Sequence, residues 1–213
     1  MHSISGSGVM DTVCRLARPQ HGRMRVVAGA LRGRVIKAPD GDATRPTTDR
    51  TREAVFNSLV SLGVIDDAVV LDLYAGSGAM GIEALSRGAR RCTFIERDRR
   101  ALDAVRANVS QLGVTDRSTV LAGDVMVNVV AQRGVDLVLV DPPYEFSDWV
   151  SLLTAIAVSL APDAVVVAES GRDLGTPPGW SVLRSKRYGR TWVSFLRVDN
   201  RAPEPRATGT VGD

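Results

Sequence analysis

The chain has 213 residues with 27 basic and 24 acidic side chains, a formal net charge of +3. This length predicts one main domain with a small addition and a sizeable core. No apolar run is long enough to span a membrane, and residues 1–23 lack the apolar stretch of a signal peptide. Cys14 and Cys92 have neither disulfide nor metal spacing, so we expect a cytoplasmic protein. His2 and His21 precede the patterned region, which argues against a histidine-based triad or metal site.

The first 64 residues are basic and contain no catalytic or cofactor-binding motif. Residues 1–23 are rich in Ser, Gly and Arg without periodicity, and we expect a disordered or non-native extension with Met24 as the natural start. Residues 25–28 and 34–37 are short strand candidates on either side of a Gly29–Gly33 turn, which predicts a β-hairpin. A loop over 39–46 then leads to a helix that begins at Thr48 or Asp49. Residues 24–64 are therefore expected to form an N-terminal extension of hairpin and helix.

Basic residues in this extension are clustered. From Arg15 to Lys37 there are seven basic residues and no acid. Such a cluster favours a polyanionic partner, although a solvated basic face would give the same pattern. The hypothesis that this region binds a nucleic acid assigns that role to Arg25, Arg32, Arg34, Lys37, Arg45, Arg50 and Arg52.

The next segment predicts a nucleotide-type cofactor site. Residues 69–74 are typical of a buried strand, and Gly76, Gly78 and Gly81 form the pattern G-x-G-x-x-G before a helix. Glu96 ends the following strand, twenty positions after Gly76, where an acid is expected to bind ribose hydroxyls. This pattern fits NAD and S-adenosylmethionine equally well. Asp72 would place an acid in the loop mouth, which favours a ligand carrying an ammonium and a sulfonium. An ordinary glycine-containing turn is the alternative.

Helices and strands then alternate up to the second motif. A helix over about 98–112 ends at Gly113, and a strand over 118–122 leads to Asp124. Asp124 fits a helix N-cap as well as an acceptor for an adenine amine, and the two roles are compatible. The apolar residues 135–140 predict a buried strand that ends directly before Asp141.

The sequence Asp141-Pro142-Pro143-Tyr144 predicts a rigid cluster of acceptors beside a flat ring. Each proline restricts its own φ and the residue before it, and neither offers a backbone donor. Such a site suits a planar group bearing an amine, such as a nucleobase. The acceptors would hold the amine while Tyr144 stacks on the ring. A rigid surface loop is the alternative.

The remaining elements complete the predicted fold. A helix capped by Ser147, a buried strand over 164–169 and a hairpin over 180–198 follow, and the hairpin carries a second basic cluster at 184–190. Residues 65–198 thus predict an α/β domain with a doubly wound, mostly parallel sheet and an antiparallel C-terminal hairpin. Residues 199–213 are expected to be a disordered tail. Ligands of such sheets bind beyond the carboxyl ends of the strands, where both motifs lie.

The two motifs resemble those of amino-methyltransferases that use S-adenosylmethionine, on a Rossmann-like class I fold. Residues 45–53, the hairpin over 25–37 and residues 78–88 narrow the resemblance to the RsmD family. Its members methylate N2 of a guanine in bacterial small-subunit (16S) ribosomal RNA. The resemblance spans about residues 24–198. It implies catalytic roles for Asp141, Pro142 and Tyr144, and cofactor binding by Asp72, Tyr74, Gly76, Gly78, Glu96 and Asp124.

The mechanism implied by the resemblance agrees with the chemistry of the residues. The Asp141 carboxylate and the Pro142 carbonyl would accept the protons of the guanine amine, and the base must be unpaired or flipped to reach them. No metal is needed. The expected partner is small-subunit ribosomal RNA in an assembled or assembling particle, and we expect the basic residues of the N-terminal extension to contact it beside the catalytic pocket. The protein itself is expected to be a monomer that does not attach to a membrane. A DNA adenine-N6 methyltransferase and a non-catalytic RNA-binding module are the alternatives.

Overall fold

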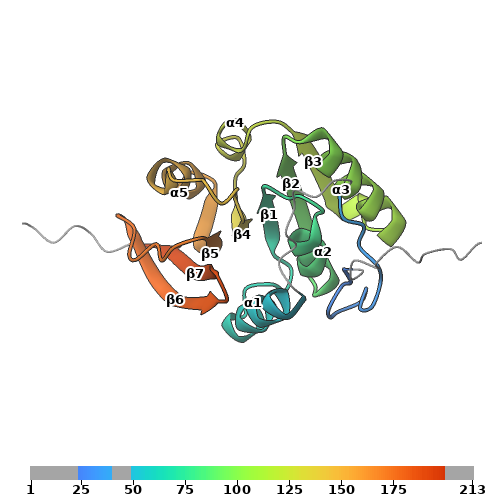
Figure 1. Cartoon of the computed structure of the whole chain (residues 1–213), viewed down its shortest axis with the longest axis horizontal. Helices are drawn as coiled ribbons and strands as arrows, with labels where there is room; N and C mark the ends of the chain where they lie inside the picture. The colour runs from blue at the N-terminus through green and yellow to red at the C-terminus, as the bar shows by residue number, and fades with distance from the viewer. Residues whose placement is uncertain (1–23, 40–48, 200–213) are drawn as a thin grey trace, which may run out of the picture.

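The computed structural model describes residues 24–39 and 49–199 (Figure 1). Its single sheet has seven strands in the order β3-β2-β1-β4-β5-β7-β6. Strands β1 to β5 are parallel, and β7 and β6 are antiparallel additions at one edge. The strands are β1 Val69–Leu73, β2 Arg91–Glu96, β3 Ser118–Ala122, β4 Val135–Val140, β5 Leu160–Ser170, β6 Trp180–Tyr188 and β7 Thr191–Val198.

Helices cover both faces of this sheet. The helices are α1 Asp49–Leu62, α2 Ala79–Ser86, α3 Arg99–Leu112, α4 Val125–Val129 and α5 Trp149–Ala157, and Thr115–Arg117 form a short 3-10 turn. Apolar residues of α1, α2 and α3 pack in one core cluster, and those of α4 and α5 pack in a second cluster on the other face. The central strands β1 and β4 are buried along nearly their whole length, as strands covered on both faces must be. The predicted doubly wound, mostly parallel sheet with an antiparallel C-terminal hairpin is confirmed.

Helix α3 begins and ends where local capping rules predict, whereas α5 is capped by another residue than the predicted one. Asp98 accepts a hydrogen bond from the N–H of Ala101, and Gly113 ends α3 with a left-handed φ of 72°. At α5 the predicted cap, Ser147, is wrong. The carboxylate of Asp148 accepts from the N–H of Ser151 instead, because the helix begins one residue later than the pattern suggested.

Residues 24–39 form a short version of the predicted hairpin. An antiparallel bridge joins Arg25 to Val35, and the N–H groups of Val26 and Ile36 donate across it to the carbonyls of Arg34 and Met24. The backbone N–H groups of Val27 and Ala28 donate to the carboxylate of Glu83 in α2. The hairpin is therefore paired within itself and is also docked on α2.

This segment also shares the core of the sheet. Met24, Val26 and Ile36 are buried in the same apolar cluster as Phe56 of α1 and Leu85 of α2. The N-terminal part of the chain thus depends on the sheet for its packing. The predicted extension over 1–23, the predicted tail over 199–213 except its first residue, and most of the predicted loop over 39–46 lie outside the described residues. No helix in the described ranges is long and apolar enough to cross a membrane.

Candidate active site

The predicted site residues gather at one edge of the sheet. Strands β1 to β5 are parallel, so they all end at the same edge of the sheet, which we call the carboxyl edge. Their last residues are Leu73, Glu96, Ala122, Val140 and Ser170. The glycine loop follows β1, Asp124 follows β3, and Asp141 follows β4. Sequence positions more than sixty residues apart are therefore brought together, as the alternation of strands and helices predicted.

The glycine loop connects β1 to α2 in a tight turn. Gly76 and Gly78 have left-handed φ values of 56° and 76°, which side chains rarely adopt. Gly81 serves packing, because a Cβ atom there would lie 2.4 Å from the ring of Phe94 and 2.6 Å from Sγ of Cys92. The loop therefore needs glycine for backbone conformation at two positions and for contact between helix and strand at the third.

Glu96 ties the end of β2 to this loop. Its Oε2 accepts from the N–H of Gly76 at 2.9 Å, and its Oε1 accepts from the N–H groups of Arg97 and Asp98 at 2.8 and 2.9 Å. The side chain is nearly buried. A carboxylate has further lone-pair positions, so these bonds orient Glu96 and leave it able to accept from hydroxyl groups.

Asp72, which was expected at the mouth of the loop, is buried within β1 and bonded to the start of α2. It is 4% exposed within β1, and its Oδ2 accepts from the N–H of Gly81 at 2.8 Å. Burial raises the pKa of Asp72 to about 8. The hydrogen bond from Gly81 lowers this pKa, and the charges of Asp141 and Glu96 raise it. Asp72 thus holds the first turn of α2 from beneath.

Tyr74 and Asp124 follow β1 and β3 and lie at the same edge of the sheet as Glu96. Tyr74 adopts a left-handed φ of 58°, an uncommon conformation for a side-chain-bearing residue that is often found at functional sites. Its half-buried ring lies 6.1 Å from the ring of Phe146, and burial followed by the charge of Asp124 raises the pKa of Tyr74. Asp124 caps α4 through the N–H of Met126, which confirms the predicted cap, and it remains exposed.

The Asp-Pro-Pro-Tyr segment lines a pocket beside these groups. Asp141 is exposed and Pro142 is buried, while the Tyr144 side chain is 56% exposed. The Tyr144 hydroxyl lies 3.3 Å from Oγ1 of Thr191, at the start of β7. Residues from the ends of β4, β5 and β7 share this pocket, which is lined by Asp141, Pro142, Pro143, Tyr144, Phe146, Trp149, Glu169, Ser170, Gly171 and Thr191.

Sequence reasoning missed two of these contacts. A Cβ atom at Gly171 would lie 3.2 Å from two ring atoms of Tyr144, so the absence of a side chain there lets the ring settle against β5. Thr191 supports the same ring from the other side through its hydroxyl. Neither position stands out in the sequence, because the residues that they contact are 27 and 47 positions away.

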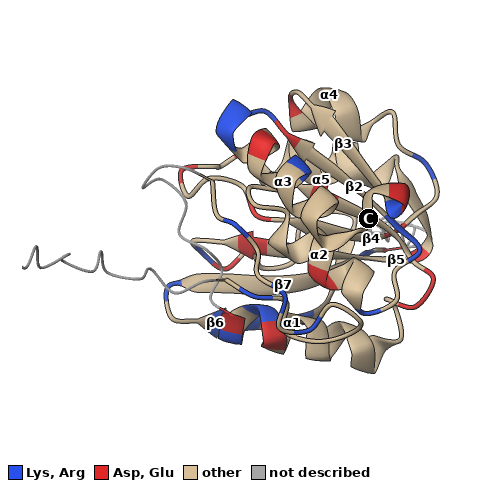
Figure 2. Ribbon diagram, turned by 90° about the vertical axis from the view of Figure 1, so that its right-hand side faces the viewer, with Lys and Arg blue, Asp and Glu red and all other residues tan. Residues whose placement is uncertain are grey.

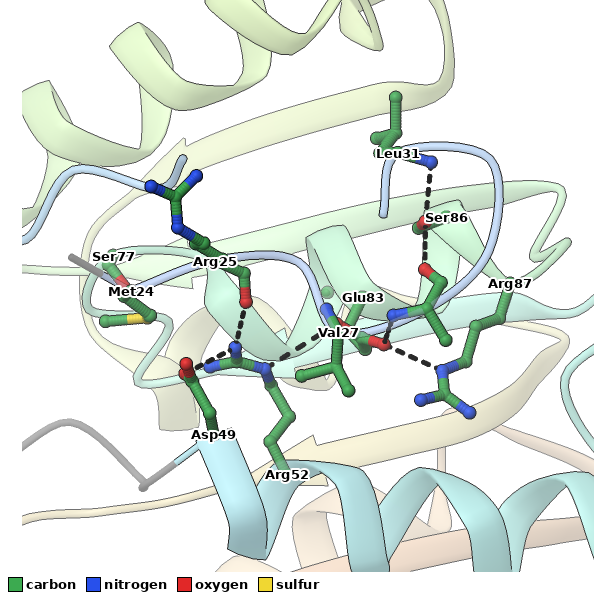
Figure 3. A network of polar contacts seen from close by, with 12 residues as sticks. Met24, Arg25, Val27, Leu31, Asp49, Arg52, Ser77, Glu83, Ser86 and Arg87 are labelled. Carbon is green, nitrogen blue, oxygen red and sulfur yellow. Dashed lines mark hydrogen bonds and ion pairs between the residues drawn. The ribbon is translucent and has the colours of Figure 1, made fainter. Parts of the chain in front are cut away.

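The prediction that Arg52 contacts RNA is wrong. Its side chain is 0% exposed and lies between Asp49, at 2.9 Å, and Glu83, at 3.6 Å (Figure 3). It also donates to the carbonyl of Arg25. A buried guanidinium is stable only when its charge is paired, and here the pairing joins α1 to α2 and to the N-terminal segment.

The predicted location of Arg32 and Arg34 beside the pocket is also wrong. Arg34 donates to the carbonyl of Gln111 near the end of α3, and the turn at Gly29 contacts Ser86 at the end of α2. Both helices start at the carboxyl edge and run back to the opposite edge of the sheet, where the next strand begins. The two exposed arginines therefore lie near the far edge.

The other residues that were predicted to contact RNA are exposed or lie outside the described residues. Arg25 is exposed but donates to the carbonyl of Gly33, within the same turn. Lys37 and Arg50 are exposed, and Arg45 lies outside the described residues.

A polar group that sequence reasoning did not identify connects the N-terminal segment to the glycine loop. Asn108 of α3 is buried; its Oδ1 accepts from the N–H of Lys37, and its Nδ2 donates to the carbonyls of Lys37 and Ser77. Ser77 also contacts Sδ of Met24 at 3.8 Å (Figure 3). No cluster of three or more metal-ligating side chains occurs in the described part of the chain.

Comparison with known proteins places this geometry in a family. A family model described as conserved hypothetical protein 95 matches residues 24–197, nearly all of the patterned chain. The ribosomal RNA small subunit methyltransferase D of Escherichia coli strain K12 is 38% identical over 192 residues, which cover 82% of this chain and 91% of that protein. The chain belongs to the RsmD family.

Two further comparisons agree over a similar span. The Haemophilus influenzae ribosomal RNA small subunit methyltransferase D is 32% identical over 176 residues, covering 79% of this chain and 90% of that protein. The solved structure of the Escherichia coli protein yhhF superposes with a TM-score of 0.74 at 36% identity and covers 84% of this chain and all of that one. The predicted class I methyltransferase fold is thereby confirmed.

Proposed function

We propose that this protein transfers the methyl group of S-adenosylmethionine to the exocyclic N2 amine of a guanine in small-subunit ribosomal RNA. The observation that carries the proposal is the meeting of two motifs at the carboxyl edge. Leu73 at the end of β1 pairs with Val140 at the end of β4, so the glycine loop and the Asp-Pro-Pro-Tyr segment leave the sheet from neighbouring strands. The RsmD relatives named for ribosomal RNA methylation support the substrate class.

The residues at this edge fit S-adenosylmethionine. The left-handed glycine loop allows close approach of a ligand to the start of α2, and Glu96 beside it can accept from ribose hydroxyls. Asp124, exposed at the end of β3, can accept from an adenine amine. When bound, the cofactor supplies an electrophilic methyl group on a sulfonium.

The cofactor assignment has a direct test. Calorimetry with S-adenosylmethionine should show binding, and Glu96→Ala should weaken it at least about tenfold, the equivalent of one charge-assisted hydrogen bond or more. Asp103→Ala, an exposed acid within α3, serves as the matched control and should change the affinity little. Tight NADH binding without binding of S-adenosylmethionine would contradict the assignment.

The acceptor motif would prepare the substrate amine. A guanine amine is a poor nucleophile because its lone pair is delocalised into the ring. The Asp141 carboxylate and the Pro142 carbonyl can accept hydrogen bonds from its two N–H groups, which localises the lone pair towards the methyl donor, and Asp141 can then take the one proton that the methylated amine releases. Pro142 and Pro143 offer no N–H that would compete for these acceptors. Holding the reacting atoms at near-attack distance then supplies much of the rate.

Tyr144 would hold the base. Its exposed ring rests on Gly171 and is anchored at the hydroxyl by Thr191, so one face remains available for stacking. Stacking of a base on an aromatic ring contributes about 1–3 kcal/mol. A base can occupy this position only when it is outside a duplex stack.

Guanine specificity can be tested by identifying the product. Small ribosomal subunits from a strain lacking this gene would be incubated with the protein and radiolabelled S-adenosylmethionine, and the RNA digested to nucleosides. We expect label in N2-methylguanosine. Label in N6-methyladenosine, or labelling of DNA but not of RNA, would overturn the proposal. Comparison with deproteinised RNA tests the further expectation of an assembled particle as substrate.

A further inference from the structure

The turn between β6 and β7 lies at the catalytic edge of the sheet. Strand β7 is antiparallel to β5, and its second residue, Trp192, pairs with Ser170 at the carboxyl end of β5. Trp192 also pairs with Arg187, and Thr191 pairs with Tyr188 across the turn. The turn at 188–191 is therefore at the same edge as the Asp-Pro-Pro-Tyr segment, and the 3.3 Å contact between Thr191 and Tyr144 joins the two.

This hairpin carries a dense positive charge. Four exposed cations occupy seven consecutive positions, and β6 itself contains no acid; we call Arg184, Lys186, Arg187 and Arg190 the hairpin cations. None of them forms an ion pair with an acid among the described residues. Figure 2, with Lys and Arg in blue, shows basic residues on this hairpin.

The hairpin cations surround the turn from both faces of the sheet. Arg184 donates to Oγ of Ser58 in α1, so it lies on the face that α1 covers. Lys186 lies on that same face by alternation, with its ammonium group 5.3 Å from the centre of the Tyr188 ring. Arg187 lies on the opposite face, and Arg190 is in the turn itself. Charges on an edge strand also discourage pairing with other chains, but that role does not require them at the catalytic end.

The order of the sheet sets the direction in which a substrate would lie. The glycine loop follows β1, the acceptor motif follows the neighbouring β4, and the hairpin lies beyond β5. The hairpin cations are thus on the side of Tyr144 that faces away from the cofactor loop. In Figure 1 the hairpin, in orange, lies at the opposite side of the molecule from residues 24–39, in blue.

We propose that the hairpin cations bind the phosphates of the RNA strand that flanks the target base. This inference rests on the proposed function and adds the surface over which the substrate enters. A base held on Tyr144 keeps its neighbouring nucleotides within the reach of long basic side chains at the adjoining turn. Phosphate contacts of this kind position a strand without reading its sequence.

A charge-matched pair of variants tests the proposal. Arg187→Gln with Arg190→Gln removes two hairpin cations, and Arg90→Gln with Arg133→Gln removes two exposed arginines next to the starts of β2 and β4, at the far edge. Binding to deproteinised small-subunit ribosomal RNA would be measured over a range of salt concentrations. Each lost phosphate contact lowers the slope of log affinity against log salt by about 0.7–0.9. The hairpin variant should lose at least about tenfold in RNA affinity and show this smaller slope.

Cofactor affinity and unfolding midpoint should be the same in both variants. Arg190→Gln alone, in the turn outside both strands, keeps the test available if the double variant does not fold. The inference is overturned if the hairpin variant binds RNA as tightly and with the same slope as the far-edge variant. It is also overturned if binding is lost only with assembled particles, since a ribosomal protein would then be the partner. Absence of methyl transfer by the unaltered protein would contradict the proposed function, while the binding comparison would still decide this inference.

Discussion

The side-chain amide of Asn108 donates to the backbone carbonyl of Ser77 at 2.9 Å, which links α3 to the glycine loop. The same side chain also bonds both backbone groups of Lys37. One buried residue therefore satisfies polar groups from the N-terminal segment and from the cofactor loop. The conformation of the loop and the docking of the segment depend on each other through it.

Asn108→Ala should destabilise the protein and weaken cofactor binding together. The change leaves the buried carbonyl of Ser77 without its partner, which costs about 1–3 kcal/mol, while the partly buried backbone groups of Lys37 can bond to water instead. Urea unfolding should show a loss in this range, and calorimetry should show weaker binding of S-adenosylmethionine. Gln111→Ala, on the exposed surface of the same helix, should change neither quantity appreciably. Unchanged cofactor affinity in a destabilised Asn108→Ala protein would mean that the link to Ser77 is not functional.

Asp72 should make the stability fall as the pH rises. Its pKa is about 8 in the folded protein against an ordinary value of 3.8. Between these values the folded state holds a proton that the unfolded state has released, so unfolding becomes easier with rising pH. The free energy of unfolding should therefore decline from about pH 4 to about pH 8 relative to Asp72→Asn. Parallel curves for the two proteins over this window would show that the Asp72 pKa is not raised.

Asp141→Ala should separate chemistry from binding. Asp141 lies directly after β4, lines the pocket and is not part of the glycine loop. Cofactor affinity should therefore stay close to that of the unaltered protein. Single-turnover methyl transfer should fall by about a hundredfold or more, the typical contribution of a positioned proton acceptor. Tyr144→Ala should act differently, mainly by raising KM, since it removes stacking worth about 1–3 kcal/mol. Near-normal turnover by Asp141→Ala would refute its catalytic role.

Gly171→Ala should reduce activity by displacing the Tyr144 ring. The new methyl group would meet two ring atoms at 3.2 Å, and the backbone at Gly171 is not in the left-handed region, so strain there is not the cause. A ring shifted by up to about 1 Å can cost as much as about a hundredfold in rate. Steady-state assays should show a lower kcat/KM with an unchanged unfolding midpoint. Tyr144→Phe, which removes only the hydroxyl contact with Thr191, provides the comparison.

The sequence by itself determined the features that depend on local pattern. Buried strands were recognised because residues such as 135–140 are continuously apolar, and the caps at Asp98 and Gly113 follow from local backbone chemistry. The convergence of the glycine loop and Asp141 at one edge was also predictable, because parallel strands end on the same side.

Only the tertiary structure decided which polar residues are available to a partner. Arg52 reads as one more cation in a basic run, yet its guanidinium is buried against Glu83, 31 positions away. Arg34 follows the same run, yet it lies at the far edge because α3 carries its partner residue there. The burial of a charge and the edge that a loop reaches both depend on which distant groups pack against it, and local sequence does not specify those contacts.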